Sequence, residues 1–171
     1  MALLQVLSYP DPFLKNIATP VDCFDEELKS FLKDMADTMY DSVGIGLAAI
    51  QVGSIKRMFV MDLGFDGDDD TTKDPLFLIN PVIIEKEGEQ IMEEGCLSVP
   101  DYRADVVRAR EITLEYQDET GAKKKIQATG LTSVCIQHEL DHLDGVLFID
   151  HLSPLRRKMI QKKLKKLAQT S

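Results

Sequence analysis

Two histidines and a glutamate stand at a spacing that suits metal-dependent hydrolysis. They form the segment His138-Glu139-Leu140-Asp141-His142, which lies in a stretch with helical periodicity. Positions i and i+4 of an α-helix lie about 40° apart, so both imidazoles can reach one metal ion from the same face. Glu139 then stands beside that ion, where it can take a proton from water. The pattern, an HExxH motif, predicts a metallohydrolase site on a helix.

A catalytic metal of this kind usually has a third protein ligand and keeps one position open for water. Two residues are candidates for this ligand, His151 and Cys96. His151 follows Gly145 in the connection to the last predicted helix, which favours a role at the surface or at the start of that helix. Cys96 follows Gly95 at the end of a strand-like run, where a thiolate can be held rigidly. We prefer Cys96, although an isolated cysteine is more often a small buried apolar residue.

A glycine-rich segment, GIGLAAIQ at residues 44–51, is the third feature with chemical potential. It has neither the GxGxxG spacing of a dinucleotide-binding turn nor the Gly-Lys-Ser or Gly-Lys-Thr of a phosphate-binding loop. Its small residues allow the backbone to pass close beside a ligand, with Gln51 presenting one polar side chain for hydrogen bonding.

The elements that must position these residues form an α+β pattern. Helical periodicity marks residues 25–40 and 131–145, and Asp11-Pro12 and Ser153-Pro154 each have the cap and proline that open a helix. Short β-rich runs lie between the helical stretches, at residues 58–63, 76–79, 82–85, 102–107, 112–116 and 125–127. We expect mixed and antiparallel strands around a central metal-binding helix that carries HELDH, followed by a C-terminal helix.

The composition is that of one globular domain. The chain has 171 residues, 44% of them hydrophobic, and 29 acidic against 20 basic side chains give a net charge of −9. No apolar run reaches the roughly 20 residues that cross a bilayer, and residues 1–10 do not resemble a signal peptide, so we expect a soluble, cytoplasmic protein. The three cysteines are too few and too far apart for a disulfide framework, and Cys23 has no assigned chemistry. The acidic total argues against general nucleic-acid binding.

The charge is unevenly distributed along the chain. Residues 155–171 carry seven basic side chains and no acidic one, whereas the other 154 residues carry 13 basic and 29 acidic ones, a charge of −16. Within this basic segment, five apolar residues fall on a helical stripe: Leu155, Met159, Ile160, Leu164 and Leu167. We expect a basic helix at about 153–169, docked by this stripe. A separate tract at 64–74, with five aspartates, lacks the ligand spacing of a calcium loop and reads as a solvated loop.

Three segments together resemble the signature motifs of one enzyme family. GIGLAAIQ at 44–51, EGCLS at 94–98 and QHELDH at 137–142 occur in the order and at the separations typical of peptide deformylases. The resemblance extends to nearly the whole chain, as a single catalytic domain over 1–171, and is closest to bacterial members that end in a helix. It implies a hydrolase that removes the formyl group from the N-terminal formyl-methionine of newly synthesised polypeptides and releases formate.

The resemblance also implies a metal site. Cys96, His138 and His142 would hold the ion, with Fe(II) preferred by the family and Zn(II), Ni(II) or Co(II) able to substitute. The residue types alone would favour zinc, because one cysteine and two histidines suit its tetrahedral geometry. Glu139 would act as general base, while the Gln51 side-chain amide and the Leu97 backbone N–H would donate to the developing oxyanion.

The same resemblance extends to the substrate. Ile45, Gly46 and Gly95 would lie along the peptide backbone, and Arg103 would contact the peptide or brace the cleft. Methionine needs an apolar pocket, for which we expect the walls Met92, Leu131, Val134 and Cys135.

The basic C-terminal segment suggests a polyanionic partner. Similar enzymes use their terminal helix to bind the ribosome near the exit tunnel, so deleting residues 155–171 should weaken salt-sensitive ribosome binding more than cleavage of a short formyl-peptide. We expect neither membrane association nor sequence-specific nucleic-acid binding. Two alternatives stay open at this point: an HExxH metalloprotease that cuts internal peptide bonds, and a non-catalytic metal-stabilised ribosome-binding module.

Overall fold

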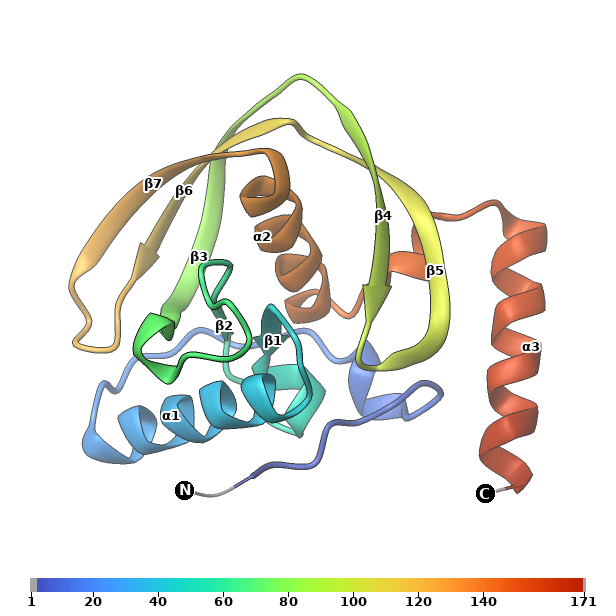
Figure 1. Cartoon of the computed structure of the whole chain (residues 1–171), viewed down its shortest axis with the longest axis horizontal. Coiled ribbons are helices and arrows are strands. Elements are labelled where there is room, and N and C mark those ends of the chain that lie inside the picture. The colour runs from blue at the N-terminus through green and yellow to red at the C-terminus, as the bar shows by residue number, and fades with distance from the viewer. Residues whose placement is uncertain (1–2, 171) are drawn as a thin grey trace.

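A curved antiparallel sheet and a separate two-stranded hairpin surround one central helix (Figure 1). The computed structural model describes residues 3–170, with side chains as far as Ala168. The sheet has the order β1-β2-β3-β6-β7, and β4 and β5 form the hairpin. The strand bounds are β1 Gly46–Ala48, β2 Met58–Met61, β3 Leu76–Glu87, β4 Gln90–Cys96, β5 Val99–Arg108, β6 Glu111–Gln117 and β7 Lys123–Thr129.

The α-helices are α1 (Glu26–Asp41), α2 (Gly130–Leu143) and α3 (Pro154–Thr170). Helix α2 runs between the sheet and the hairpin, and α3 stands at the outer edge of the molecule (Figure 1). Short 3-10 turns connect the elements: η1 Pro12–Lys15, η2 Ala49–Val52, η3 Asp70–Thr72 and η4 Phe148–His151. The predicted fold class is confirmed, since α2 carries HELDH at the centre of an α+β fold. Within residues 3–170, no helix is both long enough and apolar enough to cross a bilayer.

Helix α1 begins where its sequence indicates. The Asp25 carboxylate accepts a hydrogen bond from the Leu28 backbone N–H at 2.9 Å, which caps the first turn. Leu28, Leu32, Met35 and Met39, spaced three or four residues apart, are all buried against β1 and β2. This packing supports β1, the edge strand of the sheet, which is part of the glycine-rich segment and lies next to α2.

Helix α2 is buried around most of its circumference. Ile136, Leu140 and Leu143 pack into the main core, so the polar side chains that share the helix are buried with them. Among these, Glu139 is 3% exposed and His142 is 1% exposed. Burying a polar group costs free energy unless the group is hydrogen-bonded, so a buried polar atom on α2 that lacks a partner is unusual.

The structure differs from the strand prediction at residues 76–87. The predicted runs at 76–79 and 82–85 are one strand, β3, which continues through Pro81 with a register shift between Ile79 and Val82. Asn80 adopts a positive φ there, and its side chain hydrogen-bonds the backbone N–H and C=O of Val21 at 2.8 and 2.7 Å. A proline that suggests a turn is tolerated because the strand is bulged at that point.

The predicted apolar stripe of α3 is wrong in extent. Ile160 and Leu164 are buried, whereas Leu155, Met159 and Leu167 are 74%, 54% and 58% exposed. The two buried residues lie one turn apart, so α3 contacts the core along a narrow line. An edge helix has a neighbour on one side only, and a five-residue stripe is wider than that contact.

Candidate active site

Three potential metal-ligand atoms converge where the end of β4 meets α2. The Cys96 Sγ lies 3.2 Å from the His142 Nε2, which lies 3.2 Å from the His138 Nε2. The ligand atoms of all three residues are within 4.8 Å of one another. His151, the other sequence candidate, instead directs its Nε2 to the Asp141 carboxylate at 2.7 Å. The geometry brings together the trio that the resemblance implied.

Glu94 sets the orientation of the His138 ring. Its Oε1 lies 2.9 Å from the His138 Nδ1, and since a carboxylate accepts, Nδ1 carries a hydrogen and Nε2 is the ring nitrogen that faces Cys96 and His142. Burial alone would raise the pKa of Glu94, but the hydrogen bonds and charges of Arg108 and His138 outweigh it and lower this pKa to about 2. Glu94 is therefore ionised as it holds the histidine.

Arg108 on β5 holds Glu94 in turn. Its Nε and Nη2 donate to the two Glu94 oxygens at 2.9 Å each, and its Nη1 donates to Asp141 on α2. The side chains of Arg108 and Glu94 are only 5% and 4% exposed. Sequence reasoning missed this network: Glu94 and Asp141 lie inside the quoted motifs, but no local signal singles out Arg108.

Glu139 points into the site without a fixed partner. Its Oε2 is buried and has no hydrogen-bond partner among the described groups, and its Oε1 lies 3.8 Å from the His138 Nε2. Burial raises the pKa of Glu139 to about 7, against the opposing charge of His138. A carboxyl group with a pKa near neutrality suits proton transfer at physiological pH.

Gly46 on β1 is required for this placement. A Cβ at Gly46 would lie 3.1 Å from the Glu139 Cδ and 3.2 Å from the Cys135 Sγ, closer than side chains ordinarily pack. The glycine therefore lets the β1 backbone approach α2 directly. The close approach is to a helix, whereas the sequence predicted a close passage beside a ligand.

The Gln51 amide is held in one orientation. Its Oε1 accepts from the Ala48 backbone N–H at 2.9 Å, while its Nε2 donates to the Ser98 Oγ at 3.1 Å and lies 3.5 Å from the Cys96 Sγ. Because the carbonyl side is engaged by backbone, the NH₂ group is the end presented towards Cys96. Ser98 was not anticipated in this role.

A cavity of about 640 Å³ opens beside these residues and is lined in part by Gln51, Cys96, Leu97, His138 and Glu139. Val43 and Leu131 at this cavity are 91% and 51% exposed, and the exposed Arg103 is paired with Glu93 at 2.7 Å. All the residues predicted to bind substrate line this cavity: Ile45, Gly46, Met92, Gly95, Arg103, Leu131, Val134 and Cys135.

Comparison with known proteins agrees with this geometry. The family model described as polypeptide deformylase matches residues 3–158. The chain belongs to this family. It is 48% identical to a peptide deformylase of Brucella suis over 169 residues, covering 98% of this chain and 95% of the relative, and 50% identical to peptide deformylase 2 of Xanthomonas axonopodis, covering 97% and 96%.

Solved structures of the family share the fold over almost the full length. A peptide deformylase from Legionella pneumophila superposes with a TM-score of 0.89 at 44% identity, covering 99% of this chain and 97% of the other. One from Ehrlichia chaffeensis, in complex with actinonin, has a TM-score of 0.88 at 36% identity and covers 97% and 98%. The curved sheet, the hairpin and the central helix are thus the family fold.

Proposed function

We propose that this protein is a metal-dependent hydrolase that removes the formyl group from the N-terminal formyl-methionine of newly synthesised polypeptides and releases formate. The observation that carries the proposal is the convergence of Cys96, His138 and His142 beside Glu139 at the wall of a cavity, in a chain of the deformylase family. Neither alternative from the sequence, an internal-cutting protease or a non-catalytic ribosome-binding module, gains support from the comparisons.

The residues present fit a divalent metal ion. One thiol and two imidazole nitrogens face a common point, and the Glu94 contact leaves the lone pair of His138 Nε2 directed there. We assign Fe(II) as the physiological ion, with Zn(II), Ni(II) or Co(II) as substitutes. When bound, such an ion lowers the pKa of water towards neutrality and polarises a carbonyl oxygen.

Glu139 performs the proton transfers in this proposal. As a carboxylate it takes the proton from the attacking water, and as the acid so formed it delivers that proton to the departing amine nitrogen. Its buried position and a pKa of about 7 allow both states near neutral pH.

Two donors act on the formyl oxygen as negative charge develops there. These are the Gln51 NH₂ group, already held by Ala48 and Ser98, and the Leu97 backbone N–H at the cavity wall. One such donor typically lowers the barrier by about 3 kcal/mol. Gln51→Leu should therefore reduce kcat by roughly a hundredfold or more, with metal content unchanged. Near-normal turnover in this variant would remove Gln51 from the mechanism.

We infer that the methionine side chain of the substrate binds in this cavity. Met92, Leu131, Val134 and Cys135 form its apolar wall, and an unbranched thioether adapts well to such a surface. Ile45, Gly46 and Gly95 lie where an extended peptide can pass the metal trio, and Arg103 stands beside Gly95 on the neighbouring strand.

The decisive experiment combines metal analysis with a formate-release assay. Protein purified anaerobically should contain one equivalent of Fe(II) and deformylate a formyl-Met peptide. The same peptide without the formyl group serves as the control, and its internal cleavage would indicate the metalloprotease instead. Metal binding without release of formate would favour the non-catalytic module.

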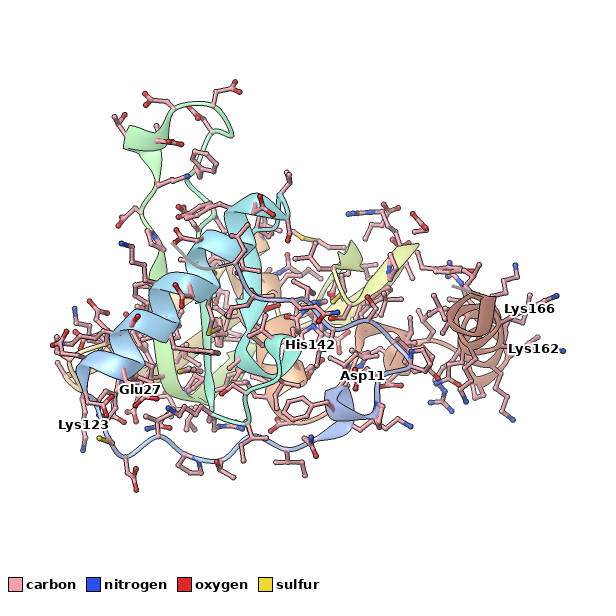
Figure 2. All side chains as sticks on the ribbon, turned by 90° about the horizontal axis from the view of Figure 1, so that it is seen from below. Asp11, Glu27, Lys123, His142, Lys162 and Lys166 are labelled. Atoms are coloured by element: carbon pink, nitrogen blue, oxygen red, sulfur yellow. The ribbon has the colours of Figure 1, made fainter. Side chains whose placement is uncertain are left out.

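The ribosome is the proposed partner, in the cytoplasm, through α3. Figure 2 shows Lys162 and Lys166 directed away from the rest of the protein, and six of the seven cations of this segment are exposed. No acidic side chain among the described residues forms an ion pair with them. Their field is therefore available to a polyanion.

Charge reversal tests this surface better than deletion, because Ile160 and Leu164 of α3 are part of the core. The double variant Lys162→Glu and Lys166→Glu should lose salt-sensitive ribosome binding and retain peptide deformylation. Lys123→Glu with Lys124→Glu is the control: both residues lie on β7, and Figure 2 shows Lys123 at the end of the molecule opposite α3. Equal ribosome affinity of the two double variants would refute a role for α3.

A further inference from the structure

His151 ends η4, beyond the metal motif, and makes a specific contact back to α2. Its Nε2 lies 2.7 Å from the Asp141 Oδ2. A carboxylate accepts, so Nε2 carries the hydrogen and donates. The Arg108 Nη1 lies 3.4 Å from the same nitrogen and also donates to the Asp141 Oδ2. Two donors from different elements thus converge on a single oxygen, and no hydrogen bond joins them to each other.

This contact is the outer end of a continuous chain of hydrogen bonds. Asp141 binds Arg108, Arg108 binds both oxygens of Glu94 at 2.9 Å, and Glu94 binds the His138 Nδ1 at 2.9 Å. The chain joins η4, α2, β5 and β4. Each link is charge-assisted, and such links have more restricted geometry than neutral hydrogen bonds.

Exposure changes sharply along this chain. The Glu94 and Arg108 side chains are 4% and 5% exposed, Asp141 is 25% exposed, and His151 is 37% exposed. The interior links are held by their surroundings, but the Asp141 carboxylate is within reach of water. Without a second donor it is free to turn towards solvent, and the Arg108 Nη1 then loses its buried acceptor. His151 supplies that second donor.

We propose that His151 is a positioning residue for the metal site: by fixing the Asp141 carboxylate it holds Arg108 and Glu94 in place, and through them the ring of His138. This inference rests on the proposed function, since it takes His138 as a metal ligand. It gives a supporting role to His151, which is not one of the three potential metal ligands and does not line the cavity beside them.

Two substitutions and one control test the proposal. His151→Leu removes the donor, while His151→Gln retains an N–H donor at about the position of Nε2. Asp144→Asn is the control, because Asp144 lies on the same end of α2 and pairs with Arg57 at 3.0 Å, outside the chain that leads to His138. Each protein is loaded with Co(II), and its visible spectrum and the rate of cobalt loss to a chelator are measured, together with thermal melting of the metal-free protein.

We expect His151→Leu to lose Co(II) about tenfold faster than the unsubstituted protein, at the lower end of the effect of removing an outer partner of a ligating histidine. Its cobalt bands should shift or broaden as the His138 ring becomes less constrained. His151→Gln and Asp144→Asn should stay within about twofold, because both leave a donor or the entire chain intact.

Three results would overturn the inference. Cobalt loss from His151→Leu equal to that from Asp144→Asn shows that the outer donor does not reach His138. If His151→Gln loses cobalt as fast as His151→Leu, and both melt lower without metal, the role of His151 is to hold η4 and not the site. If the unsubstituted protein binds no Co(II), the proposed metal site is wrong. If it binds Co(II) normally and His151→Leu is unaffected, only the inference about His151 is wrong.

Discussion

Helices α2 and α3 both carry many polar side chains and use them in opposite ways. On α2, Gln137, Glu139 and His142 are 6%, 3% and 1% exposed, and the neighbouring Asp141 is bonded to Arg108 and His151. On α3, the basic side chains are mostly exposed and have no acidic partner among the described residues. Burial imposes a fixed geometry on α2, whereas exposure leaves α3 with a long-range field and no fixed geometry.

The difference lies in the neighbours as well as in the residue types, since α2 carries acidic and histidine side chains whereas the charged residues of α3 are all basic. A sheet and a hairpin surround α2, so each polar group there must have a partner or a function. A single narrow contact through Ile160 and Leu164 holds α3, so its charges remain hydrated. Substitutions of the polar residues of α2 should therefore change chemistry and stability, whereas substitutions of the exposed cations of α3 should change association only.

The largest effect is expected at Glu139, the buried carboxyl of α2 whose Oε2 has no hydrogen-bond partner among the described residues. Glu139→Ala should lower the rate of formate release by about a thousandfold, since a positioned general base contributes roughly 10²–10⁴ to a rate. The metal content should be unchanged, because Glu139 is not part of the Cys96–His138–His142 trio. Formate assays and metal analysis of the same preparation test this, and retained turnover would refute the general-base role.

The next largest effect is expected at the buried ion pairs around α2. Arg108→Met leaves Glu94 and Asp141 without their shared cation, and breaking a buried ion pair costs about 3–5 kcal/mol in the free energy of unfolding. Arg156→Met on α3 removes the same kind of charge from an exposed position and should change stability by less than about 0.5 kcal/mol. Urea denaturation of both variants measures the contrast, and equal effects would contradict it.

Asp62, a carboxylate outside both helices, tests whether burial combined with hydrogen bonding also fixes a polar group elsewhere in the protein. Asp62 accepts from the Tyr40 hydroxyl at 2.5 Å and from the backbone N–H groups of Gly64, Phe65 and Asp74 at 3.0, 3.2 and 2.8 Å. Burial alone would raise the pKa of Asp62, but these donors, Tyr40 first, outweigh it and hold the pKa below its usual value. Asp62 therefore stabilises the acidic loop as a carboxylate.

The sign of the pH dependence follows from this depressed pKa. The contribution of Asp62 is complete above the unfolded-state pKa of about 4 and is lost as the pH falls through the lower folded-state value. Asp62→Asn should reduce the free energy of unfolding by about 1–3 kcal/mol at pH 7, with a smaller difference below pH 4. Denaturation curves from pH 2.5 to 7 measure it, and a difference that grows towards low pH would contradict the assignment.

The smallest effect on the isolated enzyme is expected on α3. Replacing Lys162 and Lys166 with glutamine should leave kcat/KM for a short formyl-peptide within about twofold, and the unfolding free energy within about 0.5 kcal/mol. These cations contact neither the cavity nor the metal trio. A marked loss of turnover on the short peptide would mean that α3 influences the site as well as association.

Much of the site could be predicted because it lies in contiguous residues. The i, i+4 histidines on α2, the cysteine after Gly95 and the glutamine that ends the glycine-rich segment lie together in the structure, and the residues predicted as pocket walls line the cavity. Helix α1 could be predicted equally well from the sequence, because its cap at Asp25 and the spacing of its apolar residues are local features. Strand β1 was not predicted as a strand, since three residues are too few to show a period.

Local spacing along the chain was thus sufficient to propose the metal motif and the general base and to predict the charged terminal helix, because a helix brings residues three and four apart onto one face. The arrangement around that motif depends on long-range pairing. Arg108 meets residues 14 and 33 positions away, and Glu94 meets His138 across 44. The contact width of α3 was likewise settled by which elements lie beside it. Such partners are chosen by strand register and packing, and neither is written in the neighbouring residues.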